Sequence, residues 1–322
     1  MRKQGEKMSR RKTREEITYD NIAKNLLSKK IVLAHILINS LKEFKGLTPN
    51  EVVSLIEEEP KVSKRYVHRW GVNIIDFISD KIKGRNTEDN TMNEGKTTYD
   101  IIFDAYLPNN EEKIKMIINV EAQYKFDNGY DIETRAIYYC AKMLSSQKGV
   151  EFFKSDYDNI KKVYSIWICI KCPNEAQNTM IEYSIVPKNI VGKYPYQNKK
   201  YDMLSVVIIG LSSEIVEESE EHKLHRLLET FFSPKISKEE KKRIIETEYD
   251  IECSEKMERS MEEMCNASKY LIDLGKIAGI VTMAVEYIED SEITIRRLMR
   301  EFNLSKEEAK EEYEEYSSAV KK

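Results

Sequence analysis

Long apolar runs are absent from this chain of 322 residues. The longest uncharged apolar stretch, Ile277 to Val285, is far shorter than the roughly 20 residues that a membrane-spanning helix needs. The charged N-terminal segment has no apolar run behind it, so it does not resemble a secretory signal. We therefore expect a cytoplasmic protein that does not insert into a membrane.

Cysteine is also scarce, with five residues spread over the whole length. Such a number excludes the dense disulfide framework of a small secreted domain and favours reduced thiols. Cys169 and Cys172 have the spacing of a zinc motif, but they lie in the apolar run VYSIWICIKC. Residues three apart on a strand point to opposite faces, which favours packing in the core over a shared zinc ion.

A net positive charge is lacking as well, since the formal net charge is −4. The charge is nevertheless unevenly spread: Lys and Arg number 20 against 15 Asp and Glu in residues 1–100, and 14 against 12 in residues 101–200. In residues 201–322 they number 18 against 29. The acidity therefore lies in the last third, and the basic N-terminal region is compatible with a polyanion such as DNA.

Hydrophobic residues (41%) and charged residues (34%) together indicate a folded chain with solvated helices. Residues 1–17 form a basic, flexible arm in this interpretation, residues 18–235 the main domain, and residues 236–322 an acidic helical region. Asp20 is placed to cap a helix that carries the apolar residues from Ile22 to Leu37. Thr48 and Glu51 have the spacing of a capping box for a second helix.

The middle of the chain has the pattern of β-structure. Short runs rich in Ile, Val and Tyr, bounded by turn-forming residues, predict strands at 98–107, 114–121, 163–170, 180–186 and 204–211. The segment Tyr130 to Gln147 lacks Pro and Gly and is long enough for a helix between the second and third strands. A helix between two strands is typical of a parallel pair, so we expect an α/β (α+β) fold with a mixed sheet flanked by helices.

The chain after Glu214 is helical and highly charged. Its last two segments, around Ile293–Phe302 and Ser305–Tyr316, are separated by a short turn and resemble a helix-turn-helix. The second segment is rich in glutamate and would repel phosphate groups. We interpret this C-terminal extension as a solvated region or as a site of homo-oligomerisation.

Polar residues interrupt the apolar strands at one place. Asp100 lies on the first predicted strand, and Glu121 and Gln123 lie near the end of the second, where residues two apart share a face. Buried carboxylates require a cation, and hard oxygen ligands select Mg²⁺ or Mn²⁺. Asp100, Glu121 and the backbone carbonyl of Ala122 are the predicted metal ligands.

The order of these motifs resembles the PD-(D/E)XK nuclease superfamily and, within it, the recombination-promoting nuclease/putative transposase family. The similarity covers roughly residues 18–270. The matching segments are YDNIAKNLLSKKIVLAHIL (19–37), EGKTTYDIIFDAYLP (94–108), INVEAQ (118–123) and ETRAIYYCAKMLSSQ (133–147), with weaker matches at HRLLETFFSP (225–234) and MCNAS (264–268).

The resemblance implies a restriction-endonuclease-like fold and a metal-dependent endodeoxyribonuclease. In that family pattern, the metal ligands are Asp100 and Glu121, and a bound Mg²⁺ lowers the pKa of its water. Gln123 stands where much of the superfamily has lysine, so it orients water rather than acting as a cation or base. Arg135 and Tyr139 are assigned to the scissile phosphate or to bracing Glu121; Gln147 matches the pattern without a mechanism.

Several assignments keep an alternative. Asp104 shares a strand face with Asp100, but it is displaced by about 13 Å along the strand, so Asp100 is preferred. Arg135 and Tyr139 are nearly as compatible with packing of their helix, and Asp20 is either a cap or an additional ligand.

Two further groups are ambiguous. His222 and His225 have helical spacing without a third ligand nearby, which favours packing over zinc. The basic and aromatic cluster of Lys64, Arg65, Tyr66, Arg69 and Trp70 fits either DNA or a solvated helix face. A catalytically inactive relic of the nuclease fold, which binds DNA or a protein, is the second hypothesis for the whole chain.

Overall fold

The structure, a computed structural model, describes residues 14–62, 88–91, 95–108, 115–126, 129–195 and 201–320. The chain divides into two compact units, Met1–Met264 and Cys265–Lys322. The helices are α1 (Arg14–Leu27), α2 (Lys30–Ser40), α3 (Pro49–Leu55), α4 (Ile132–Ser145), α5 (Lys223–Phe232), α6 (Lys238–Tyr249), α7 (Glu255–Glu286), α8 (Ser291–Phe302) and α9 (Lys306–Val320). The strands are β1 (Ile56–Val62), β2 (Glu88–Thr91), β3 (Gly95–Thr98), β4 (Ile101–Tyr106), β5 (Lys115–Lys125), β6 (Val163–Lys171), β7 (Thr179–Ser184) and β8 (Leu204–Gly210).

The first unit is built on a mixed sheet of six strands in the order β1-β4-β5-β6-β8-β7. Strands β1, β4 and β5 form an antiparallel meander, whereas β5, β6 and β8 run parallel to one another. The parallel step from β5 to β6 needs a long crossover, which α4 supplies. Strand β7 pairs antiparallel with β8 at the edge of the sheet. The fold is therefore mixed α/β, as the sequence predicts.

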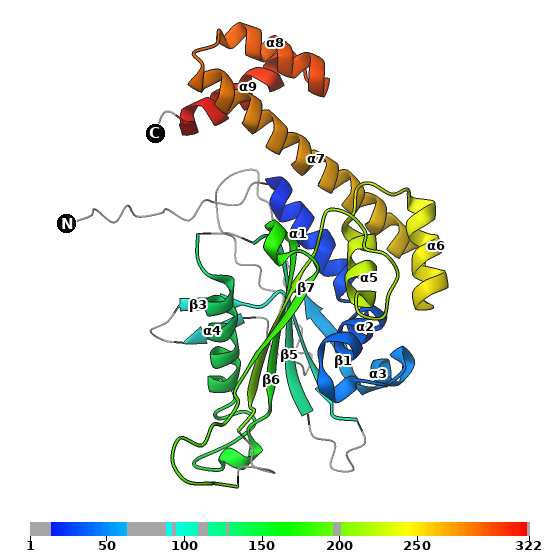
Figure 1. Cartoon of the computed structure of the whole chain (residues 1–322), viewed down its shortest axis with the longest axis vertical. Coiled ribbons are helices and arrows are strands. Elements are labelled where there is room, and N and C mark those ends of the chain that lie inside the picture. Colours follow the sequence, from blue (N-terminus) through cyan, green and yellow to red (C-terminus); the bar gives the residue numbers. More distant parts are fainter. Residues whose placement is uncertain are drawn as a thin grey trace, which may run out of the picture. The chain divides into compact units, whose positions relative to one another are not determined.

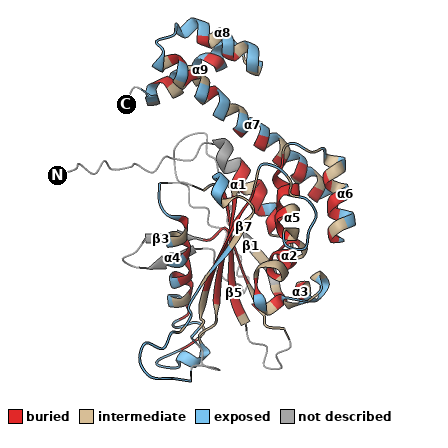
Figure 2. Cartoon of the chain, viewed as in Figure 1, coloured by how far each residue is buried: buried red, intermediate tan, exposed pale blue. Residues whose placement is uncertain are grey.

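Helices cover both faces of this sheet (Figure 1). Helix α4 lies on one face, where Ala136, Cys140 and Met143 pack with Trp167 and Val206 in a buried cluster. Helices α1, α2 and α5 lie on the other face (Figure 1). The central strands are consequently buried on both sides, as Figure 2 shows, and their continuous apolar sequences reflect that environment.

The five predicted strands and the crossover helix are confirmed, with shifted ends. The capping box at Thr48 is also confirmed, because its hydroxyl accepts a hydrogen bond from the Glu51 amide and the Glu51 carboxylate accepts one from the Thr48 amide. The prediction that Asp20 caps a helix is wrong, since α1 begins before it and Asp20 lies buried within the helix. Asp100 is not on a strand either; it lies in the bend directly before β4.

The second unit contains the end of α7 together with α8 and α9. Its core consists of Ile277 and Val281 from α7, Leu298 from α8 and Ala309 from α9. The Asp290 carboxylate accepts a hydrogen bond from the Glu292 amide and so caps α8. Helix α8 ends at Asn303 in the left-handed conformation, which reverses the chain into α9 and gives the predicted helix pair.

No helix in the described ranges combines the length and the apolar character that crossing a membrane requires. The basic and aromatic residues from Lys64 to Trp70 lie outside the described residues.

A buried histidine links the edge of the sheet to α5. The Nε2 atom of His225 lies 3.1 Å from the carbonyl oxygen of Thr179, and the ring is almost fully buried. Burial lowers the pKa of His225 from its ordinary value, and the nearby His222 acts in the same direction. The folded state therefore favours the neutral imidazole.

This shift predicts a pH dependence of stability. The stabilisation from a His with a lowered folded pKa is complete above its unfolded pKa, about 6.5, and is lost as the pH falls through that value. We expect the unfolding free energy, measured by urea titration, to fall between pH 7.5 and pH 5.5. The His225→Gln protein, whose amide can still donate to Thr179, should lose less over the same range. An equal loss in both proteins would contradict the assignment.

Candidate metal-binding site at the end of strand β5

The register between β4 and β5 brings two acids together. Ile101 pairs with Val120 and Asp104 pairs with Ile117, so the next position in the same antiparallel register sets Asp100 beside Glu121. The backbone ladder between β4 and β5 ends at Ile101. Beyond it, Asp100 is joined to β5 by hydrogen bonds that involve the carboxylates of Asp100 and Glu121. The two carboxylates therefore meet at the end of the sheet where the preferred interpretation of the sequence expects them.

Two reciprocal hydrogen bonds fix this arrangement. The backbone amide of Asp100 donates to Oε1 of Glu121 at 2.9 Å. The backbone amide of Ala122 donates to Oδ2 of Asp100 at 3.3 Å. Because the N–H and C=O of one strand residue point to the same side, the Ala122 carbonyl also faces Asp100. The three predicted oxygen donors thus converge on one place.

Both carboxylates are buried, with 8% of Asp100 and 3% of Glu121 exposed. Burial raises the pKa of Glu121 well above its ordinary value, and the neighbouring Asp100 charge raises it further. The hydrogen bond from the Asp100 amide and the charges of Arg135 and Lys24 act in the opposite direction. The site therefore holds a desolvated acid pair whose second negative charge is costly, which is the electrostatic condition for binding a cation.

Lys24 is the residue that sequence reasoning missed. Its Nζ atom lies 2.7 Å from Oδ1 of Asp100, and its side chain is 1% exposed. Lys24 belongs to α1, which lies on the face of the sheet opposite to α4 (Figure 1), and the ring of Tyr19 in α1 contacts Tyr124 in β5. In the sequence, Lys24 is a charged residue one turn after Asp20 in the same helix, and no local pattern relates it to Asp100.

Arg135 approaches the acid pair from α4, on the other face. One guanidinium nitrogen donates to the hydroxyl of Tyr139 at 2.8 Å, and another donates to the hydroxyl of Tyr130. The guanidinium carbon also lies 5.1 to 5.3 Å from the ring centroids of Tyr130, Tyr139 and Trp167. This aromatic cage fixes the cation in position. Arg135 and Tyr139 therefore contact each other as expected, and the positive charge acts on Glu121 through space.

Tyr139 is itself part of this packing. Its ring makes edge contacts with Tyr99 and Trp167, and burial raises its pKa to about 12, with the Glu121 charge acting in the same direction. The hydroxyl therefore stays protonated at neutral pH and accepts from Arg135. The structure thus gives Arg135 and Tyr139 a packing role within the described residues, and a role toward phosphate remains a prediction.

Gln123 lies on the same face of β5 as Glu121, because the two residues are two positions apart. Only 6% of Gln123 is exposed, yet its amide has no hydrogen-bond partner among the described residues. Asn119, two positions before Glu121, also has a buried Oδ1 atom without a partner in the described part of the chain. The alternation of Asn119, Glu121 and Gln123 along β5 is the sequence signal for this polar face.

Gln147 has a different surrounding. Its side-chain amide donates to the carbonyl of Lys161 at 2.9 Å, and its side-chain oxygen accepts from the Lys161 amide at 2.7 Å. These bonds hold the chain just before β6 begins at Val163. Glu121 pairs with Trp167 on β6, which is six residues after Lys161. At the rise of a strand, the Gln147 contacts therefore lie about 20 Å from Glu121 along the sheet. Gln147 is therefore placed to stabilise the entry into β6.

The alternative residues are also placed by the fold. Asp104 pairs with Ile117 in the ladder, four positions from Glu121, which separates it from the acid pair. Asp20 lies one turn before Lys24 on α1 and is buried. The ring centroids of His222 and His225 lie 5.4 Å apart. Cys169 and Cys172 both lie in the buried cluster beneath α4.

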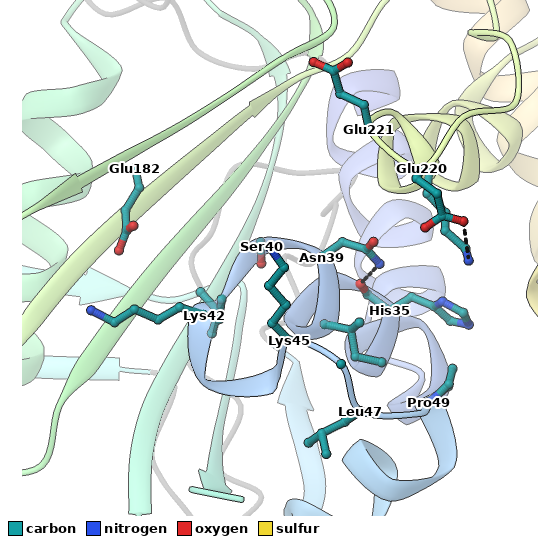
Figure 3. Close-up of a pocket in the computed structure, with 14 residues that line it drawn as sticks. His35, Asn39, Ser40, Lys42, Lys45, Leu47, Pro49, Glu182, Glu220 and Glu221 are labelled. Carbon is teal, nitrogen blue, oxygen red and sulfur yellow. Dashed lines mark hydrogen bonds and ion pairs between the residues drawn. The ribbon is translucent and has the colours of Figure 1, made fainter.

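A separate pocket of about 840 Å³ is lined by residues of α2, of the segment that follows it and of β7 (Figure 3). Its lining includes His35, Asn39, Lys42, Glu182 and Glu220, and no member of the acid pair contributes to it. The charges in its lining are mixed, with three lysines and three glutamates. The pocket therefore has no net charge that would select one class of ligand, and the acid pair remains the better candidate for chemistry.

The donor set of the acid pair suits a hard divalent cation. Two carboxylates and a backbone carbonyl converge, and Mg²⁺ commonly takes one or two protein carboxylates and keeps several waters. Within the ranges that the structure describes, no group of three or more His, Cys, Asp or Glu side chains is placed to hold a metal ion. The remaining ligands would thus be water or substrate oxygens.

No protein-family model, curated protein or solved structure matches this chain at a significant level.

The two buried glutamines allow a matched test of which positions serve stability. Gln147→Leu removes two hydrogen bonds to the backbone, and we expect a loss of about 2 kcal/mol in unfolding free energy. Gln123→Leu removes no bond within the described structure and should change stability by less than about 0.5 kcal/mol, or increase it. Urea unfolding of both proteins checks this, and a large loss for Gln123→Leu would show that its amide has a structural role.

Proposed function

We propose that this protein is a metal-dependent endodeoxyribonuclease of the transposase-associated PD-(D/E)XK type, with a restriction-endonuclease-like core. The observation that carries the proposal is the pair of hydrogen bonds that holds Asp100 against Glu121 and Ala122 at the end of β5. The mixed sheet with helices on both faces supports such a core. The positive balance of residues 1–200 is compatible with DNA as the substrate.

Asp100 and Glu121 would hold Mg²⁺ or Mn²⁺ between them in this proposal. The bound ion would supply a water of lowered pKa and would offset negative charge that develops on the phosphate. Phosphodiester hydrolysis forms a bond from the water oxygen to phosphorus and breaks one bond from phosphorus to a sugar oxygen, which leaves with a proton.

The side chains around the acids would orient the reactants. The Gln123 amide, which has no hydrogen-bond partner among the described residues, is available to orient the attacking water, although it cannot accept its proton as a base. Arg135, held rigidly by its aromatic cage, supplies a fixed positive charge on the α4 side of the acids. A fixed charge costs little reorganisation when the negative charge of the reaction develops.

Nicking of supercoiled plasmid tests the reaction. We expect wild-type protein to nick DNA with Mg²⁺ or Mn²⁺ and not with EDTA. Asp100→Asn and Glu121→Gln each replace a charged ligand with a neutral amide of similar size. Each should lower the rate by about 100-fold or more, a loss of about 2.7 kcal/mol in transition-state stabilisation. Asp104→Asn, on the same strand face, is the matched control and should retain activity.

Equal rates in the wild type and in both acid variants would remove these residues from the mechanism. A similar loss of activity in Asp104→Asn would show that removal of any negative charge near β4 slows the reaction, whatever its position.

A second candidate function is a catalytically inactive relic of the nuclease fold that binds DNA or a protein. The ion pair of Lys24 with Asp100 favours it, because this contact neutralises one acid from within the chain. Gln123, in the position where much of the superfamily has lysine, also favours it. Isothermal titration separates the two candidates, since a relic shows no Mg²⁺ binding that depends on both acids.

A further inference from the structure

Lys24 occupies the position that a metal ion would need on Asp100. Its ammonium lies 2.7 Å from Oδ1, while Oδ2 accepts from the Ala122 amide. The side chain of Lys24 is 1% exposed and that of Asp100 is 12% exposed. Water therefore screens this ion pair very little, so the Coulomb attraction between the two charges is stronger than in a surface salt bridge.

The charge balance of the site supports the same conclusion. The Lys24 ammonium lies beside two buried carboxylates, and the Arg135 guanidinium is held on the α4 side by its aromatic cage. A single monovalent cation thus compensates one acid, whereas a divalent ion would compensate both. The Lys24 ammonium and a divalent ion carry three positive charges together, and they would repel each other in this desolvated space beside two carboxylates.

We propose that Lys24 is an internal counter-ion of the metal-binding site, which competes with a divalent cation for Asp100. This inference rests on the proposed metal-dependent function. Metal binding then requires the Lys24 ammonium to leave Oδ1. A flexible lysine stem allows this movement, because four rotatable carbons carry the charge. The cation affinity of the site is consequently set by a residue of α1, outside the strands that carry the acids.

The test is the affinity for Mn²⁺, measured by isothermal titration and by the electron spin resonance of free Mn²⁺ without DNA. Lys24→Met keeps the length and apolar stem but removes the charge. An adjacent opposite charge changes the proton affinity of a carboxylate by one to three pKa units, so we expect Mn²⁺ to bind at least about tenfold more tightly to Lys24→Met than to the wild type. Loss of folding or of a structural support would weaken binding instead.

Two control proteins accompany this measurement. Lys24→Arg retains the charge and should bind Mn²⁺ within about threefold of the wild type. Lys29→Met removes a lysine in the turn after α1, which makes no ion pair among the described residues, and should not change the affinity. Circular dichroism and thermal unfolding confirm that each variant is folded.

The outcomes separate this inference from the proposed function. Equal or weaker Mn²⁺ binding by folded Lys24→Met, with binding by the wild type, would overturn the competition and leave the metal site standing. Binding by neither protein would overturn both. Mn²⁺ binding by Lys24→Met but not by the wild type would support the inference, because Lys24 would then exclude the ion from Asp100 completely.

Wild-type crystals soaked in Mn²⁺ provide a measurement that needs no variant. We expect the distance from Lys24 Nζ to Asp100 Oδ1 to lengthen beyond hydrogen-bond range when Mn²⁺ lies on Asp100. An ammonium that stays within 3 Å of Oδ1 with Mn²⁺ on the same carboxylate would overturn the inference, even if Lys24→Met did not fold.

Discussion

The rest of the site depends on one constraint, the repulsion between two carboxylates held side by side out of water. The register of β4 against β5 imposes it, because it sets Asp100 beside Glu121 at the end of the ladder. Hydrogen bonds hold the two acids together, since the Glu121 carboxylate accepts one from the Asp100 amide and the Asp100 carboxylate accepts one from the Ala122 amide. The fold therefore maintains an electrostatic cost that is relieved when one acid takes up a proton or when a cation lies beside the pair.

The surrounding helices relieve this cost from the two faces of the sheet. Lys24 contacts Asp100 from the α1 side, whereas the caged Arg135 acts on Glu121 from the α4 side. The two cations differ in kind. The lysine is a single ammonium on a flexible stem, and the guanidinium is fixed by Tyr130, Tyr139 and Trp167. One charge can thus be exchanged while the other remains in place.

Some polar residues of the segment serve the fold rather than the site. Gln147 bonds both polar groups of the Lys161 backbone and stabilises the entry into β6. Gln123 is also largely buried, with 6% exposed against 0% for Gln147, and it makes no such bond to the backbone within the described residues. Two glutamines that look alike in the sequence therefore differ in what surrounds them, and only contacts distinguish them.

The sequence by itself determined the strands and the crossover helix, because alternation and chain order are local signals. It also predicted that Asp100 and Glu121 lie together, although it placed Asp100 on a strand rather than in the bend before β4. It did not determine that Asp20 lies within a helix, since a capping residue and an interior residue can have the same neighbours. Lys24 entered the site only through tertiary structure, 76 positions before Asp100 in the chain. Packing of α1 against β5 decided that contact, and no local pattern encodes a distance between distant segments.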